Sequence, residues 1–264
     1  MTLEWDAAEY EVVANPHVGW GTGLLEVALE RRPLVGDEAA MDAGCGTGRV
    51  TELLLERLPG GTVLAVDASG AMVEAARRRF AGDERVRVER WDLLKLEVEE
   101  PVDLILSTAT FHWIKNHEKL FNVLASALKP GGRLVAQCGG QGNIAQVTRA
   151  IEEVMGEERF REHFAGWRDN KEYADPATTK ARLEAAGFEE IETWLHEEPT
   201  EFGSTEELTR YLKAVVLGRH LERLPEVDHQ SFADAVATRV AAVQDPPVMD
   251  YVRLNILATR RRES

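Results

Sequence analysis

The chain has 264 residues, of which 44% are hydrophobic and 29% are charged, the balance of a globular protein with a sizeable core. Its formal net charge is −15, and a surface this acidic repels nucleic-acid phosphates and anionic lipid head groups. Composition and charge therefore argue against DNA, RNA and membrane surfaces as partners.

Cysteine and histidine usage gives no sign of a disulfide framework or a metal site. Cys45 and Cys138 are the two cysteines, and neither belongs to a ligand pattern. The seven histidines show no ligand spacing with carboxylates, so no metal is predicted. The first residues, MTLEWDAAEYEVV, lack the basic start and apolar core of a secretory signal, and no apolar run has the length of a bilayer span. These features predict a cytoplasmic protein.

Apolar runs of strand length alternate with amphipathic runs of helix length through the first half of the chain. Strands are predicted over residues 38–44, 62–69, 85–93, 102–110 and 133–139. Helices are predicted over residues 48–58, 69–80 and 117–128, with Ser69 as the cap of the second helix. This alternation predicts right-handed βαβ crossovers and therefore a parallel sheet with helices on both faces.

The second half of the chain is less regular. Helical segments are predicted over about residues 143–163, 176–188, 204–221 and 229–243, and strands over 189–198 and 251–261. We interpret residues 1–264 as one α/β domain with a Rossmann-like, seven-stranded, mostly parallel sheet. In this interpretation a cap helix covers about residues 1–30 and the core covers about 36–140. A helical insertion over about 200–245 completes a helical lid.

A glycine-rich loop, Asp42-Ala43-Gly44-Cys45-Gly46-Thr47-Gly48, lies directly between the first predicted strand and its helix. Glycines there allow a sharp turn and a close approach of the backbone to a ligand, next to a helix N-terminus. A dinucleotide fingerprint, G-x-G-x-x-G, would require glycine where Arg49 stands, and no G-K-[ST] of a nucleotide P-loop follows. The loop therefore fits neither of these two phosphate-binding patterns.

Acidic residues end the next two predicted strands. Asp67 ends the second strand, where a carboxylate can accept hydrogen bonds from two ribose hydroxyls. Asp92 ends the third strand, and Met72 lies early in the helix that follows Asp67. Taken singly, these residues could be a helix cap, a turn former and a core side chain. In register with the glycine loop they indicate one ligand site.

The spacing D-x-G-x-G-x-G after a buried strand resembles the first motif of class I S-adenosylmethionine (SAM)-dependent methyltransferases. The resemblance implies that the loop wraps the methionine part of SAM, that Asp92 accepts from the adenine amino group and that Met72 packs on the adenine. It also implies that SAM is converted to S-adenosylhomocysteine (SAH). The cofactor-binding residues expected on this basis are Asp42, Gly44, Cys45, Gly46, Gly48, Asp67, Ala68, Met72, Asp92, Leu93 and Ser107.

The loop after the fourth predicted strand, Ser107-Thr108-Ala109-Thr110-Phe111-His112-Trp113, has the form [NS]-x-[AS]-x-x-[HQ]-W. It is similar to a segment of the trans-aconitate methyltransferases and the malonyl-carrier-protein methyltransferases, which methylate carboxylates. Trp5-Asp6-Ala7-Ala8-Glu9-Tyr10 and the final YVRLN strand add to this resemblance. The resemblance implies transfer to a carboxylate oxygen of a small-molecule acceptor.

His112 stands where several carboxyl methyltransferases carry glutamine. A carboxylate is already ionised near neutral pH and needs only orientation, whereas a phenol, amine or carbon acid needs a base, and histidine titrates in the useful range. His112 is therefore the candidate catalytic residue, either as a base or as an orienting group. Tyr10 and Trp20 are candidate acceptor-side residues because aromatic faces attract a sulfonium, and Trp113 is a candidate pocket wall. Each of these aromatics could equally be core packing.

Three alternatives to carboxylate transfer remain open at this point. The first is an N-, C- or phenolic O-methyltransferase on the same fold. The second is an NAD-dependent oxidoreductase, against which Arg49 argues. The third is a non-catalytic SAM-binding protein, because cofactor motifs do not encode the acceptor. The sequence does not fix the oligomeric state, although a monomer is favoured.

Overall fold

The computed structural model describes residues 4–13 and 15–262. Its main feature is a seven-stranded sheet in the order β3-β2-β1-β4-β5-β9-β6. β1 to β5 pair in parallel, and β9 runs antiparallel to both β5 and β6. The strands are β1 (Ala39–Ala43), β2 (Thr62–Asp67), β3 (Val86–Arg90), β4 (Val102–Thr108), β5 (Leu128–Gly139), β6 (Phe188–Glu197) and β9 (Val252–Arg260). This arrangement confirms the predicted seven-stranded, mostly parallel sheet.

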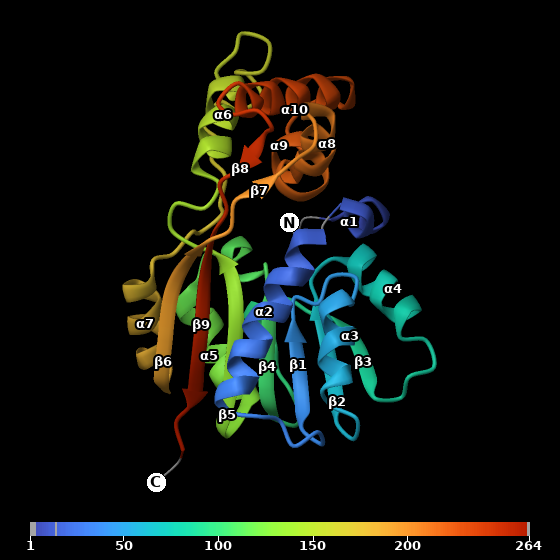
Figure 1. Cartoon of the computed structure of the whole chain (residues 1–264), viewed down its shortest axis with the longest axis vertical. Helices are drawn as coiled ribbons and strands as arrows, with labels where there is room; N and C mark the ends of the chain where they lie inside the picture. Colours follow the sequence, from blue (N-terminus) through green and yellow to red (C-terminus); the bar gives the residue numbers. More distant parts are fainter. Residues whose placement is uncertain (1–3, 14, 263–264) are drawn as a thin grey trace.

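Helices cover both faces of this sheet (Figure 1). One face carries α2 (Asn15–Arg31), α3 (Arg49–Glu56) and α4 (Gly70–Arg79), and the other carries α5 (His117–Ala127) and α7 (Pro176–Ala185). Side chains alternate between the two faces of a strand, so β4 buries Leu104 and Leu106 on the α2–α3 side and Ile105 on the α5 side. This two-sided burial explains why β4 is a continuous apolar run in the sequence.

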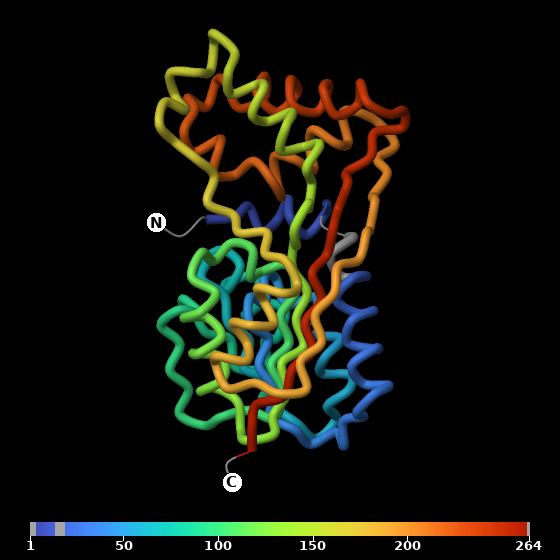
Figure 2. Tube along the Cα trace, turned by 90° about the vertical axis from the view of Figure 1, so that its left-hand side faces the viewer, coloured from blue at the N-terminus to red at the C-terminus, as the bar shows by residue number. Residues whose placement is uncertain are grey.

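A second, helical lobe lies above the carboxyl ends of the parallel strands, and we call it the cap (Figure 1). Its elements are α6 (Ala145–Met155), α8 (Thr205–Tyr211), a π-helix (Leu212–Val216), α9 (Gly218–Leu221), α10 (Glu226–Ala241) and the short strands β7 (Thr200–Glu201) and β8 (Val248–Met249). The cap has its own core, in which Phe160, Leu212 and Phe232 are buried. Figure 2 shows the chain rising from β6 into the cap and returning from it into β9.

The N-terminal segment differs from the single cap helix predicted over about residues 1–30. Residues 1–3 and 14 lie outside the described part of the chain. α1 (Ala7–Val13) lies between the cap and the sheet, whereas α2 packs on β4 and β5 and buries Leu24 and Leu25 there (Figure 1). Conversely, α6 packs on α10, so the cap also recruits a helix that precedes residue 200. Within the described residues, no helix is long and apolar enough to cross a membrane.

Candidate active site

A cavity of about 400 Å³ lies between the carboxyl ends of the parallel strands and the cap. The loops after β1, β2, β3 and β4 form its floor. The cap closes it with Val215 and Val216 from the π-helix, and the N-terminal segment contributes Trp5 and Tyr10. Ligands of open parallel sheets bind at this edge, so the cavity is the candidate active site.

The glycine loop after β1 brings the backbone to the cavity wall. Gly44 has a φ of +91°, and a Cβ there would lie 2.0 Å from Oγ1 of Thr110, so this position requires glycine. Gly46, with a φ of +55°, lines the cavity and has no other heavy atom within 4 Å of the place of a Cβ. Gly48, directly before α3, packs against the ring of Phe80. The loop is therefore packed tightly at Gly44 and Gly48, and between them Gly46 leaves open space in the cavity, which we call the hollow at Gly46.

Asp67, at the end of β2, holds the loop in place. Its Oδ2 accepts a hydrogen bond from the N–H of Gly46 at 3.0 Å, and its Oδ1 accepts one from the N–H of Ser69 at 2.8 Å. Burial raises the pKa of the Asp67 carboxyl above its ordinary value, and the two N–H groups oppose that shift. Asp67 lines the cavity at the place predicted for a ribose-binding acid.

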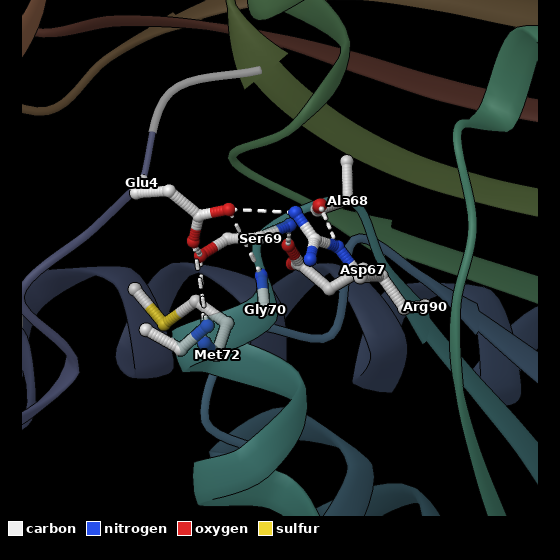
Figure 3. A network of polar contacts seen from close by, with 8 residues as sticks. Glu4, Asp67, Ala68, Ser69, Gly70, Met72 and Arg90 are labelled. Carbon is white, nitrogen blue, oxygen red and sulfur yellow. Dashed lines mark hydrogen bonds and ion pairs between the residues drawn. The ribbon is translucent and has the colours of Figure 1, made fainter.

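Glu4, in the segment before α1, ties that segment to the end of β2 and the start of α4 (Figure 3). One carboxylate oxygen accepts from the hydroxyl of Ser69 at 3.0 Å, and the other pairs with Nη2 of Arg90 at 2.7 Å. The N–H groups of Gly70 and Ala71, at the start of α4, lie 3.4 Å from the same carboxylate. The α4 dipole favours a negative charge there. Glu4 was not predicted as a site residue, because no local pattern links it to a helix cap 65 residues later.

α1 is tied to both lobes by charged side chains. Glu11 accepts from the hydroxyl of Thr47 in the glycine loop and forms an ion pair with Arg79 of α4. Arg79 also donates from Nε to the carbonyl of Thr47 at 2.9 Å. On the cap side, Glu9 pairs with Arg210 of α8. α1 therefore connects the glycine loop to the cap.

The predicted cofactor-binding residues divide into two groups. Those that line the cavity are Gly44, Gly46, Asp67, Ala68, Met72, Asp92 and Leu93. Those that do not line it are Asp42, Cys45, Gly48 and Ser107. This second group supports the loop from behind; for example, the hydroxyl of Ser107 donates to the carbonyl of Ala43 at 2.6 Å.

Asp42 is a fully buried member of the supporting group. Its Oδ2 accepts from the hydroxyl of Thr51 at 2.6 Å, and its Oδ1 has no hydrogen-bond partner among the described residues. Burial raises the pKa of Asp42 to about 7, while the hydrogen bond from Thr51 lowers it and the charge of Asp67 raises it. Asp42 thus links the end of β1 to α3 behind the glycine loop and does not line the cavity.

His112 lies in the short 3-10 helix Phe111–Trp113, between β4 and α5. Its Nδ1 accepts a hydrogen bond from the N–H of Gly139, at the end of β5, at 3.2 Å. A ring nitrogen that accepts from an N–H carries no proton, so the neutral imidazole has its proton on Nε2. The ring lines the cavity with its centroid 5.1 Å from that of Trp113 and 5.9 Å from that of Tyr173.

The predicted acceptor-side aromatics are divided as well. Tyr10 and Trp113 line the cavity, and Trp20 does not. The ring of Trp20 packs on that of Tyr251, with centroids 4.8 Å apart, and lies 4.6 Å from the guanidinium carbon of Arg253. Trp20 therefore supports two residues that line the cavity instead of lining it.

Cationic side chains that the sequence analysis missed line the cavity on the side of His112. They are Lys171, Arg219 and Arg253; the exposed Lys115 lines the cavity as well. Lys171 donates to Oδ2 of Asp169 at 2.8 Å, and its ammonium lies 4.8 Å from the ring centroid of Trp113. Burial lowers the pKa of Lys171, and its partner Asp169 opposes that shift. These residues come from a loop, the cap and the last strand, so no local motif marks them.

Comparison with known proteins places the chain in a family. Residues 41–134 match a family model described as a methyltransferase domain. A trans-aconitate 2-methyltransferase of Methylobacterium nodulans is 31% identical over 280 residues, which cover 98% of this chain and 99% of the relative. The chain belongs to the class I SAM-dependent methyltransferases.

Within the class I SAM-dependent methyltransferases, the chain falls in the subgroup of the trans-aconitate and malonyl-carrier-protein methyltransferases. A malonyl-[acyl-carrier protein] O-methyltransferase of Priestia megaterium is 36% identical over 109 residues, 41% of this chain and 39% of the relative. The crystal structure of the YcgJ protein of Bacillus subtilis shares the fold, with a TM-score of 0.63, 15% identity and coverage of 92% of this chain and 100% of that one. The chain is therefore a SAM-dependent enzyme, and the alternatives of an NAD-dependent oxidoreductase and a non-catalytic binder do not apply.

Proposed function

We propose that this methyltransferase transfers the methyl group of SAM to a carboxylate oxygen of a small organic acid. The proposal is carried by the hydrogen bond from Gly139 to Nδ1 of His112, which leaves the proton of the neutral ring on Nε2. A nitrogen protonated in this way donates a hydrogen bond and does not remove a proton. An acceptor beside it must therefore be nucleophilic without a base, as an ionised carboxylate is near neutral pH.

Other titratable groups that line the cavity also favour an acceptor that needs no base. Burial raises the pKa values of the Tyr10 and Tyr173 phenols above the ordinary value for tyrosine, and it raises the pKa of Tyr251 to about 12. All three phenols are therefore protonated near neutral pH. The ammonium of Lys171 is held in an ion pair by Asp169. The names of the two curated relatives support the same reading, because trans-aconitate and malonyl groups both carry carboxylates.

We further propose that SAM occupies the end of the cavity formed by the loops after β1, β2 and β3. The hollow at Gly46 fits the backbone approach that this cofactor requires, Asp67 would accept from the ribose and Asp92 from the adenine. Met72 and Leu93 supply an apolar wall. SAM brings a reactive methyl group on a sulfonium. The chain contributes by holding the acceptor and excluding water, and such positioning is worth roughly 7–11 kcal/mol in favourable cases.

Two variants of His112 test the acceptor assignment. His112→Gln keeps an N–H donor and should retain kcat on a carboxylic acid to within about tenfold, whereas His112→Phe should lower kcat/KM by about 10- to 100-fold, as expected for one hydrogen bond to a charged group. SAM affinity, measured by calorimetry, should be the same in both variants. If His112→Gln loses activity as completely as His112→Phe, a donor is not sufficient and a base is required.

A further inference from the structure

Arg253 is a buried cation without a counterion in the described part of the chain. It lies on β9, is 2% exposed and lines the cavity. Its Nε donates to Oε1 of Gln137 at 3.4 Å, and its guanidinium lies over the rings of Trp20 and Tyr251 at 4.6 Å and 5.8 Å. Its Nη2 has no hydrogen-bond partner, and no carboxylate pairs with it, among the described residues.

A guanidinium in such a place opposes folding. Removal of a charge from water is costly, and a carboxylate partner normally offsets that cost. Aromatic faces offset it only in part. A position of this kind is accounted for when an anionic ligand supplies the missing partner, since arginine binds carboxylates through two parallel hydrogen bonds.

The position of Arg253 in the sheet indicates which ligand that is. The residues proposed to hold SAM follow β1, β2 and β3, and β9 lies beyond β4 and β5, roughly 14 Å from β1 at the usual strand spacing. Arg253 pairs in register with Gly139, whose N–H binds His112. Arg253 therefore lies on the acceptor side of the cavity, next to the residue proposed to orient the reacting group.

Two more cations line the cavity with Arg253: Lys171 from the loop before α7 and Arg219 from the cap. Lys171 donates to Asp169 at 2.8 Å and to the carbonyl of Val216 at 3.2 Å. That carbonyl belongs to the π-helix, in which the N–H of Leu217 bonds to the carbonyl of Leu212. Arg219 follows, and its buried Nε has no hydrogen-bond partner among the described residues. Among the described residues, Asp169 pairs with Lys171 and no carboxylate pairs with Arg219.

The carboxylates that line the cavity are at its other end. Within the described residues they are Asp67 and Asp92, which follow β2 and β3. The carboxylates of the cavity therefore lie where SAM is proposed to bind, and its buried and half-buried cations lie where the acceptor is proposed to bind. Lys115, which also lines the cavity, is exposed. This separation exists in a chain whose net charge is −15, so it is a local feature of the site.

We propose that Arg253 is a specificity-determining residue that binds a second, non-reacting carboxylate of the acceptor. Lys171, from the loop before α7, and Arg219, from the cap, add positive charge on the same side of the cavity. An acceptor with a single carboxylate leaves Arg253 unpaired and is selected against. This inference rests on the proposed function, because it takes the acceptor to be an organic acid.

Calorimetric titration of the protein saturated with SAH separates binding from methyl transfer. The probes are tricarballylate, with three carboxylates, and butyrate, with one. We expect the wild type to bind tricarballylate at least about tenfold more tightly than butyrate. Arg253→Met, which keeps the volume and removes the charge, should lose this preference and keep its SAH affinity within about twofold. Arg87→Met, at an exposed arginine of β3, should behave as the wild type.

Folding of the variant is checked in the same experiment. The melting temperature of Arg253→Met without acid should equal or exceed that of the wild type, because the variant removes an unpaired buried charge. If Arg253→Met does not fold, Arg253→Lys keeps a charge but loses the two-bond geometry, and it should reduce the preference at least severalfold.

Three results would overturn the inference: equal affinity of the wild type for both probes, a preference that survives in Arg253→Met, or a loss of SAH affinity in place of the preference. The last result would assign Arg253 to the amino-acid carboxylate of the cofactor. If the preference behaves as expected but SAM yields no methyl ester on any acid, the proposed function fails and the binding role of Arg253 stands. If monocarboxylic and polycarboxylic acids are esterified equally well, the proposed function stands and the inference fails.

Discussion

The N–H of Gly139 points at Nδ1 of His112 from 3.2 Å, so the last residue of β5 fixes the protonation pattern of the ring after β4. The two residues are 27 positions apart in sequence and meet because β4 and β5 are adjacent strands. In the neutral ring this contact leaves the proton on Nε2, which is the donor role proposed for His112. Through Gly139 it also couples His112 to the strand that carries Arg253.

Nitrogen-15 NMR should report this tautomer directly. We expect the neutral imidazole of His112 to carry its proton on Nε2, because Nδ1 is used by the N–H of Gly139. His112→Gln identifies the resonances by their disappearance. A proton found on Nδ1 in the neutral ring would contradict the donor role.

Removal of the Asp67 carboxylate should weaken SAM binding. Asp67→Ala is expected to cost about 1.5–3 kcal/mol of binding free energy, the range for hydrogen bonds that involve a charged group. The control is Asp83→Ala, which removes a carboxylate paired with Arg85 outside the cavity. Titration calorimetry of both variants measures the difference. Unchanged SAM affinity in Asp67→Ala would mean that the ribose is held elsewhere.

Loosening α1 should affect cofactor release more than stability. Glu11→Gln removes the ion pair with Arg79, a partly exposed contact worth at most about 1 kcal/mol. That loss corresponds to SAM dissociation up to about fivefold faster in stopped-flow experiments, with little change in melting temperature. Glu56→Gln, whose exposed pair with Arg57 lies away from the cavity, is the matched control. Equal SAM dissociation rates in the two variants would show that the ion pair between α1 and α4 does not retain the cofactor.

The buried Asp42 should make stability depend on pH. Its folded-state pKa is about 7, above the roughly 3.9 expected for an unfolded chain. Between these values the folded state binds the extra proton, so its free energy of unfolding falls as pH rises, by at most about 1.4 kcal/mol per pH unit. Asp42→Asn removes this dependence and keeps an acceptor for Thr51. Its stability relative to the wild type should therefore increase from pH 4 to pH 7 in urea unfolding.

Asp83 provides a control of opposite sign. Arg85 lowers the pKa of the Asp83 carboxyl, so that group stabilises the folded state above the unfolded pKa and loses its effect as pH falls. Asp83→Asn should therefore lose stability relative to the wild type as pH rises, and only weakly because the pair is at the surface. A pH dependence of Asp42→Asn like that of Asp83→Asn would show that folding lowers the pKa of Asp42, and the absence of any pH dependence would show that folding does not shift it.

The parallel core was predictable because its signals are local. The glycine loop follows β1 directly, and Ser69 caps α4 as predicted, accepting from the N–H of Met72. α2 was predicted only as part of a cap helix over about residues 1–30, and the surface that it covers was not predicted. Leu24 and Leu25 pack on the sheet, a choice that depends on which face the other helices leave open.

His112, Tyr10 and Trp113 were predicted from local motifs, but the cations of the acceptor side and Glu4 at the other end of the cavity could not be, because these residues meet their partners only after folding. Arg253 has no local motif around it, and β9 carries it to the cavity by pairing antiparallel to β5. Lys171 lies in an irregular segment and depends on the π-helix carbonyl of Val216. Glu4 depends on Arg90 and on the start of α4. Each contact joins segments that no sequence window contains together.

The most direct test of carboxylate methylation is analysis of the product made by the wild-type protein. The protein would be incubated with SAM carrying an isotopically labelled methyl group and with a mixture of carboxylic acids, phenols and amines, followed by mass spectrometry. The proposed function predicts a labelled methyl ester on an acid, equimolar with SAH and cleaved by mild alkali. A label on nitrogen, carbon or a phenolic oxygen that survives alkali, with every acid unmodified, would contradict it.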